Sequence, residues 1–187
     1  YVRSKSTTRI ALMGSGISCA LVSRYREKGG TADAIVMESP FLDYGTYLYR
    51  SARQSWGIFA DFWYPVLARQ QSDILQYPVY QLNLKSQAIS WRVPAIFLAG
   101  TEDRLTYLTE TYELYEQCPA PQKDLLLIRD AGHGELATKG GEMYFNDIST
   151  FLNTVMPRRQ KPSNRKRLAL IDDRPGNHRP DTRDRTH

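Results

Sequence analysis

Long apolar runs are absent from this sequence of 187 residues. No stretch approaches the roughly eighteen consecutive apolar residues that a membrane-spanning helix requires, so the sequence predicts no transmembrane segment. Cysteine is also scarce, because the chain has only Cys19 and Cys118, and neither lies in a spacing typical of a zinc site. The sequence therefore predicts no metal site, and Cys19 is interpreted as a small packing residue.

Acidic side chains are scarce at one end of the chain. Residues 157–187 hold ten of the 25 Lys and Arg residues but only four of the 20 Asp and Glu residues, so residues 1–156 are close to neutral. The same segment is poor in apolar residues and rich in Pro and Arg, which predicts a basic disordered tail. Nucleic acid is expected as a partner only through this tail, and a solvated appendage is the favoured interpretation.

The clearest local pattern is a βαβ unit within residues 9–38. Residues 10–13 are a short apolar run that ends abruptly at a Gly-Ser-Gly turn, which is typical of a strand covered on both faces. Apolar residues then recur at helical spacing, Gly29 and Gly30 close the helix, and residues 34–37 form the next strand. Such a unit predicts a parallel sheet with ligands at the carboxyl ends of its strands.

The turn within this unit, MGSGISCA, has two interpretations. It resembles a dinucleotide-binding fingerprint in which Gly14 and Gly16 are the first two glycines. Glu38 ends the following strand at about the right distance, and Cys19 stands where the third glycine or alanine belongs. This resemblance implies a nicotinamide or flavin binder.

The same turn also resembles the nucleophile elbow of the α/β-hydrolase superfamily. In that family a strained turn lifts the nucleophile above the sheet, and small residues flank it. Gly14 and Ser18 match the small flanks, so Gly16 occupies the nucleophile position. This is a departure from the family, because glycine has no side chain to attack a carbonyl.

Two later segments favour the hydrolase resemblance. Residues 93–106 resemble the strand and loop that carry the triad acid, which would be Asp103, and residues 129–134 resemble the loop of the triad histidine, which would be His133. The order of turn, acid and histidine is that of the family. The resemblance implies that His133 takes the nucleophile's proton and that Asp103 orients the imidazole.

The nucleophile itself stays open between two residues. Gly16 is the favoured positional equivalent. Ser18 is the alternative, because Gly16 and Ala20 on either side of it are small, but this choice shifts the elbow by two residues into the predicted helix. Ser15 is a remote candidate, because Met13 and Ile17 would then occupy the positions of the small flanks, and both are large.

The resemblance implies a mostly parallel α/β sheet with flanking helices over residues 1–156. It covers the later part of the hydrolase fold, from the elbow strand to the C-terminal helix, so the N-terminal strands are expected to be missing, as in a fragment, a cleaved chain or a degenerate copy. Residues 42–91 are expected to form a cap-like helical insertion. The spacing of Trp56, Phe59 and Trp63 favours packing on the sheet over lining of a substrate pocket.

These observations predict a serine hydrolase-like protein without a cofactor. It would act on ester, thioester or amide bonds of small-molecule, acyl or peptide substrates, and Gly16 at the nucleophile position implies that activity is lost. The alternatives are a catalytically silent hydrolase-fold binding protein and, less favoured, a dinucleotide-binding oxidoreductase fragment. The compartment stays open, because the chain begins at Tyr1 without Met.

Overall fold

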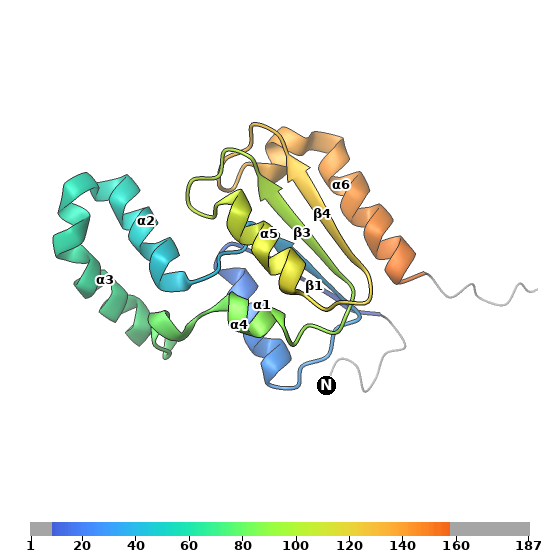
Figure 1. Cartoon of the computed structure of the whole chain (residues 1–187), viewed down its shortest axis with the longest axis horizontal. Helices are drawn as coiled ribbons and strands as arrows, with labels where there is room; N and C mark the ends of the chain where they lie inside the picture. The colour runs from blue at the N-terminus through green and yellow to red at the C-terminus, as the bar shows by residue number, and fades with distance from the viewer. Residues whose placement is uncertain (1–8, 158–187) are drawn as a thin grey trace, which may run out of the picture. The chain divides into compact units, whose positions relative to one another are not determined.

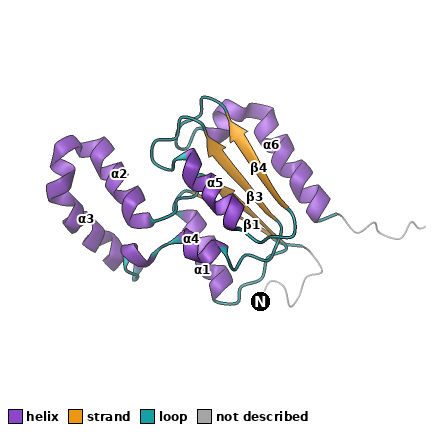
Figure 2. Ribbon diagram, in the orientation of Figure 1, coloured by secondary structure: helices purple, strands orange, loops and turns teal. Residues whose placement is uncertain are grey.

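The computed structural model of the chain describes residues 9–157. At its centre is a parallel sheet in which the strand order β1-β2-β3-β4 follows the sequence (Figures 1 and 2). The four strands are β1 (Ala11–Ser15), β2 (Ala34–Glu38), β3 (Ala95–Gly100) and β4 (Lys123–Ile128). The predicted parallel α/β sheet is therefore confirmed, whereas the predicted basic tail lies outside the described residues beyond Pro157.

Six α-helices accompany these strands within residues 9–157. They are α1 (Ser18–Glu27), α2 (Tyr44–Trp56), α3 (Ala60–Leu75), α4 (Leu84–Ala88), α5 (Leu108–Gln117) and α6 (Leu136–Val155). Short 3-10 turns, η1 (Gly57–Phe59) and η2 (Val79–Gln81), flank α3. Helices α1, α4 and α5 cover one face of the sheet and α6 covers the other (Figure 1).

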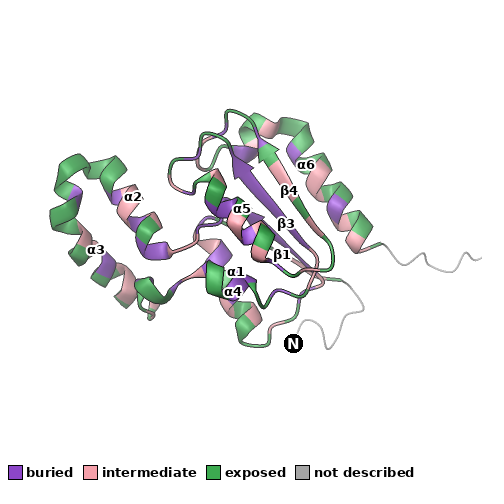
Figure 3. Cartoon of the chain, viewed as in Figure 1, coloured by how far each residue is buried: buried purple, intermediate pink, exposed green. Residues whose placement is uncertain are grey.

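The two central strands are buried on both faces, which explains their continuous apolar sequences. Along β2, Ile35 and Met37 pack with the α1 side of the core, whereas Val36 between them packs with the α6 side. Every residue of β2 and β3 is buried, as Figure 3 shows for β3. The alternation follows from the two-residue period of a strand, and it holds helices against both faces of the sheet.

Helices α2 and α3 form an antiparallel pair joined by η1 (Figure 1). The expectation that Trp56, Phe59 and Trp63 pack on the sheet is wrong, because these side chains are 44%, 67% and 50% exposed. They line an open groove of about 720 Å³ together with Val66 and Leu67. The three residues do not share one helix face either, because Trp56 ends α2, Phe59 lies in η1 and Trp63 lies in α3.

Phe97 provides a test of the packing on β3. Its ring is fully buried and lies beside Trp91 and Tyr115, with centroids 6.1 and 6.0 Å away. Phe97→Ala should lower the free energy of unfolding by about 3–5 kcal/mol, because it removes a buried ring and leaves a cavity. Phe62, 73% exposed on α3, is the matched control, and Phe62→Ala should cost no more than about 1 kcal/mol. Equal losses in urea denaturation would contradict the fold.

Candidate active site

The turn between β1 and α1 has the sharp geometry that its glycines predict. Gly16 has a φ of 52°, in the left-handed region that glycine adopts without steric cost. Its N–H donates to the Glu38 carbonyl at 2.9 Å, and its carbonyl accepts from the Cys19 N–H at 3.0 Å. A Cβ at Gly14 would lie 2.7 Å from the Cys19 backbone nitrogen, so only glycine allows α1 to approach β1 this closely.

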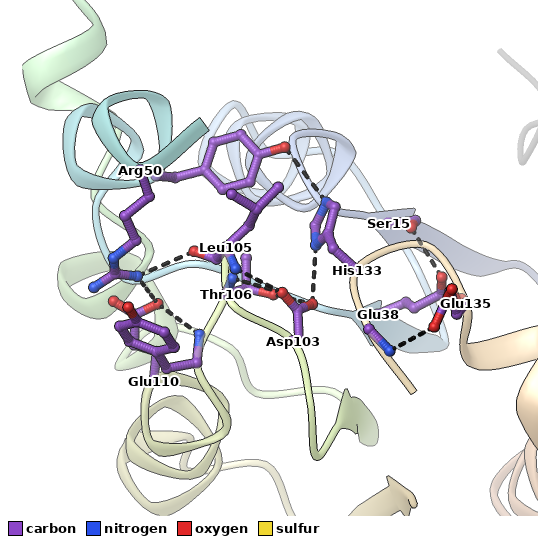
Figure 4. A network of polar contacts seen from close by, with 12 residues as sticks. Ser15, Glu38, Arg50, Asp103, Leu105, Thr106, Glu110, His133 and Glu135 are labelled. Carbon is purple, nitrogen blue, oxygen red and sulfur yellow. Dashed lines mark hydrogen bonds and ion pairs between the residues drawn. The ribbon is translucent and has the colours of Figure 1, made fainter. Parts of the chain in front are cut away.

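Gly16 faces the imidazole of His133. A Cβ built on Gly16 would lie 3.5 Å from Nε2 and 3.6 Å from Cε1 of that ring. Ser18, the first residue of α1, forms no hydrogen bond with His133 in the described part of the chain. The Ser15 hydroxyl donates instead to Glu38 Oε1 at 3.0 Å (Figure 4). Of the three candidate positions, the structure brings Gly16 against the ring.

Asp103 and His133, which come from two successive loops, lie in direct contact. His133 Nδ1 is 2.9 Å from Asp103 Oδ2, and the Asp103 side chain is fully buried (Figure 4). The loops are held together by the backbone, because Glu102 N–H donates to the Ala131 carbonyl at 3.0 Å. A Cβ at Gly100 would lie only 2.2 Å from that carbonyl oxygen, so the end of β3 must be glycine for the loops to meet.

The Asp103 carboxylate accepts several hydrogen bonds in addition to the one from His133. The donors are the N–H groups of Leu105 and Thr106, both at 2.9 Å, and the Thr106 hydroxyl at 2.7 Å. Burial alone would raise the pKa of Asp103, but the hydrogen bonds from His133 and Thr106 outweigh it and lower the pKa to about 2. Asp103 is therefore ionised at neutral pH, and the proton on His133 Nδ1 points at it.

Two residues of α2 that contact this region were not identified from the sequence. The Tyr47 hydroxyl lies 3.4 Å from His133 Nε2. One turn further on, Arg50 pairs with Glu110 at 2.8 Å and donates to the Leu105 carbonyl at 3.1 Å (Figure 4). These contacts connect α2 to both the histidine and the loop of the acid. The aromatic pattern predicts helix within residues 42–91, but it does not indicate which turn of a helix faces the carboxyl ends of the strands.

Glu38 does not offer the free carboxylate that the dinucleotide interpretation needs. It is only 9% exposed, and its two oxygens accept hydrogen bonds from Ser15 and from Tyr144 on α6. Burial and this hydrogen bond raise the pKa of Tyr144, so the phenol stays a donor. The carboxylate is thus used inside the protein, where it connects the end of β2 to α6.

Cys19 packs in the interior, as the sequence predicts. Its side chain is fully buried, and the thiol donates to the carbonyls of Gly14 and Glu38 at 3.3 and 3.4 Å. Burial raises the pKa of the thiol, so a reactive thiolate is disfavoured. Within residues 9–157, no group of three or more His, Cys, Asp and Glu side chains is arranged to hold a metal ion. No helix of that range combines the length and apolar character needed to cross a membrane.

Several solved structures resemble this chain. An esterase of Pyrococcus furiosus is 22% identical with a TM-score of 0.59, and the match covers 79% of this chain and 54% of the esterase. A monoacylglycerol lipase of Paleococcus ferrophilus is 17% identical with a TM-score of 0.55, covering 82% of this chain and 72% of the lipase. An N-acyl homoserine lactone degrading enzyme is 18% identical with a TM-score of 0.53, covering 80% and 69%. No family model and no curated protein matches the chain.

These neighbours have the α/β-hydrolase fold, and this chain shares it. The sheet topology and the structural matches thus confirm the hydrolase resemblance and the fold class. The chain spans about half the length of the Pyrococcus esterase, which agrees with a match to part of that fold.

The hydrogen bonds of Asp103 predict an acid-dependent contribution to stability. The pKa of its carboxyl is about 2 in the folded protein and about 3.9 in an unfolded chain, so folding is stabilised above pH 4 and this gain is lost as the pH falls toward 2. The free energy of unfolding of the wild type, measured against Asp103→Asn, should fall by about 2 kcal/mol between pH 5 and pH 2.

Thr106→Val serves as the graded variant in the same titration. It removes the Thr106 hydroxyl from the carboxylate but leaves both N–H donors, so the drop relative to Asp103→Asn should be smaller than in the wild type. Parallel stability curves for wild type and Asp103→Asn across this range would show that the hydrogen bonds do not stabilise the ionised acid.

Proposed function

We propose that this chain is a hydrolase-fold protein that binds an acyl-type ligand at the acid–base pair of a serine hydrolase, with the nucleophile absent. Asp103 and His133 would be the acid and the base, and Gly16 would stand where the nucleophile belongs. The observation that carries this proposal is the 3.5 Å approach of a Gly16 Cβ to His133 Nε2, since that nitrogen is the one that takes a proton in a catalytic triad.

The backbone supports Gly16 as the positional equivalent of the nucleophile. Its positive φ is the conformation expected at the tip of such an elbow, where any other residue would be strained, and α1 begins two residues later. Ile17, which follows the tip, carries the N–H that would serve as one oxyanion donor in this fold. A glycine at the tip leaves the base and one donor in place without a group that can form a covalent intermediate.

Two observations favour an acyl ligand: the names of the similar solved structures and the apolar lining of the groove. The solved structures that resemble this chain include a monoacylglycerol lipase and an enzyme that degrades N-acyl homoserine lactones. Trp56 in the groove and Tyr47 beside His133 lie on the same helix, nine residues apart, which is about 14 Å along the axis and half a turn around it. The groove is therefore a surface separate from the Asp103–His133 pair, and its exposed aromatic walls suit an apolar chain.

A second candidate is an active hydrolase that uses Ser18. The observation in its favour is the position of Ser18 in the first turn of α1, partly exposed and close to the elbow tip. A rotation of α1 would be needed to bring its hydroxyl to His133, because the two side chains form no hydrogen bond in the described structure.

Covalent labelling separates these two functions. The unmodified chain should show no reaction with a fluorophosphonate probe, whereas Gly16→Ser should become labelled because its hydroxyl would meet His133 Nε2. The new side chain should cost about 1–2 kcal/mol of stability, since L-residues are strained at this φ. Adding His133→Ala to Gly16→Ser should reduce the labelling rate at least about a hundredfold.

Ser15→Ala and Ser18→Ala are the matched controls in the Gly16→Ser background, and both should retain labelling. Strong labelling of the unmodified chain that disappears in Ser18→Ala would instead establish the active hydrolase. A labelled Gly16→Ser that is indifferent to His133→Ala would contradict the assigned base.

The groove provides a separate test of ligand class. A medium-chain fatty acid should bind with a measurable heat in calorimetry. Trp63→Ala should weaken that binding, because it removes a large apolar side chain from the wall of the groove. Ile74 lies on the same helix, is 66% exposed and is not among the groove residues, so Ile74→Ala is the control. Equal effects of the two variants, or no binding by the wild type, would sink the acyl assignment.

A further inference from the structure

Nε2 of His133 has a second neighbour besides the glycine at the elbow. The Tyr47 hydroxyl is 3.4 Å from this nitrogen, and the two rings are 5.6 Å apart between centroids. Because Gly16 brings no side chain, the phenol is the protein hydroxyl hydrogen-bonded to Nε2 among the described residues. This is the hydrogen bond that a serine nucleophile makes in a complete triad.

The phenol is held in place by its surroundings. Its ring stacks on Phe41 and Tyr44, with centroids 5.6 and 5.7 Å away, and both of those residues are almost fully buried. One turn along α2, Arg50 pairs with Glu110 on α5 and donates to the Leu105 carbonyl in the loop that follows Asp103. Tyr47 is thus positioned by packing and by an ion pair on the same helix.

The direction of the hydrogen bond follows from the protonation of its neighbours. Burial and the charge of Asp103 raise the pKa of Tyr47, so its phenol is protonated at neutral pH. Since Asp103 is ionised and accepts from Nδ1, the neutral imidazole presents Nε2 as an acceptor. The phenol therefore donates to Nε2, and Tyr47, His133 and Asp103 form a chain of three hydrogen-bonded groups.

We propose that Tyr47 is a positioning residue that takes the hydrogen-bonding place of the missing nucleophile on His133. The phenol keeps Nε2 occupied and holds the ring over Gly16. A hydroxyl introduced at position 16 then has to compete with Tyr47 for the same lone pair. The functional meaning of this inference rests on the proposed function, but the hydrogen bond itself can be tested without any reaction.

The first experiment uses nuclear magnetic resonance on the ¹⁵N-histidine-labelled full chain. Tyr47→Phe keeps the stacked ring and removes the donor, so the His133 Nε2 resonance should move downfield toward the value of a free acceptor. Tyr44→Phe is the matched control, because the Tyr44 hydroxyl contacts Gln71 and its loss should leave the resonance in place. His133→Gln assigns the signal. An Nε2 resonance unchanged in Tyr47→Phe would overturn the proposal.

The second experiment measures competition in the Gly16→Ser background. Adding Tyr47→Phe should raise the fluorophosphonate labelling rate about two- to tenfold, the factor that one neutral hydrogen bond is worth. Adding Tyr44→Phe should leave the rate unchanged. A rate that stays level or falls in Tyr47→Phe would overturn the competition. If Gly16→Ser itself reacts with no probe, the proposed function fails, and the resonance experiment still decides the role of Tyr47.

Discussion

The close approach of α1 to β1 is the constraint on which the candidate site depends. Gly14 allows it, because any Cβ there would collide with the backbone of Cys19. The chain must then reverse within two residues, and Gly16 supplies the left-handed conformation that this requires. Since parallel strands end at one edge of the sheet, the same turn lies beside the loops that follow β3 and β4. The meeting of Gly16 with His133 is thus a consequence of backbone packing.

The loop that carries Asp103 is stabilised by its own hydrogen bonds. Asp103 accepts from two backbone N–H groups, a hydroxyl and His133, and none of these donors belongs to the β1–α1 turn. The His133 ring is in turn held between Asp103 and Tyr47. Asp103 and His133 are thus ordered by contacts in which no side chain of the β1–α1 turn takes part. Their hydrogen bond joins the loops that follow β3 and β4.

Sequence reasoning located the parts of the site that follow from strand ends. The βαβ pattern predicts Gly16 at a turn, and the apolar runs before Asp103 and His133 place both residues after parallel strands, where the topology brings them together. The contacts of Tyr47 and Arg50 were not predicted, because helical spacing shows which residues share a face but not which other elements that face contacts. The error at Trp56, Phe59 and Trp63 has another cause: a spacing of three and four residues does not show that the helix breaks at Gly57, so these residues lie in α2, η1 and α3 and line a groove.

The turn at Gly16 has a conformation that would be strained for any residue other than glycine. Its conformation is fixed by the Gly14 contact with Cys19 and by the hydrogen bond from Gly16 N–H to the Glu38 carbonyl, both of which are backbone interactions. A side chain at position 16 would therefore be forced into the same φ, pointing at the imidazole, because the rest of the turn cannot relax without losing these contacts. The direction of a side chain at position 16 is thus determined by backbone contacts of Gly14, Cys19 and Glu38. A substitution at this one position would change what faces the imidazole, while the surrounding fold stays the same.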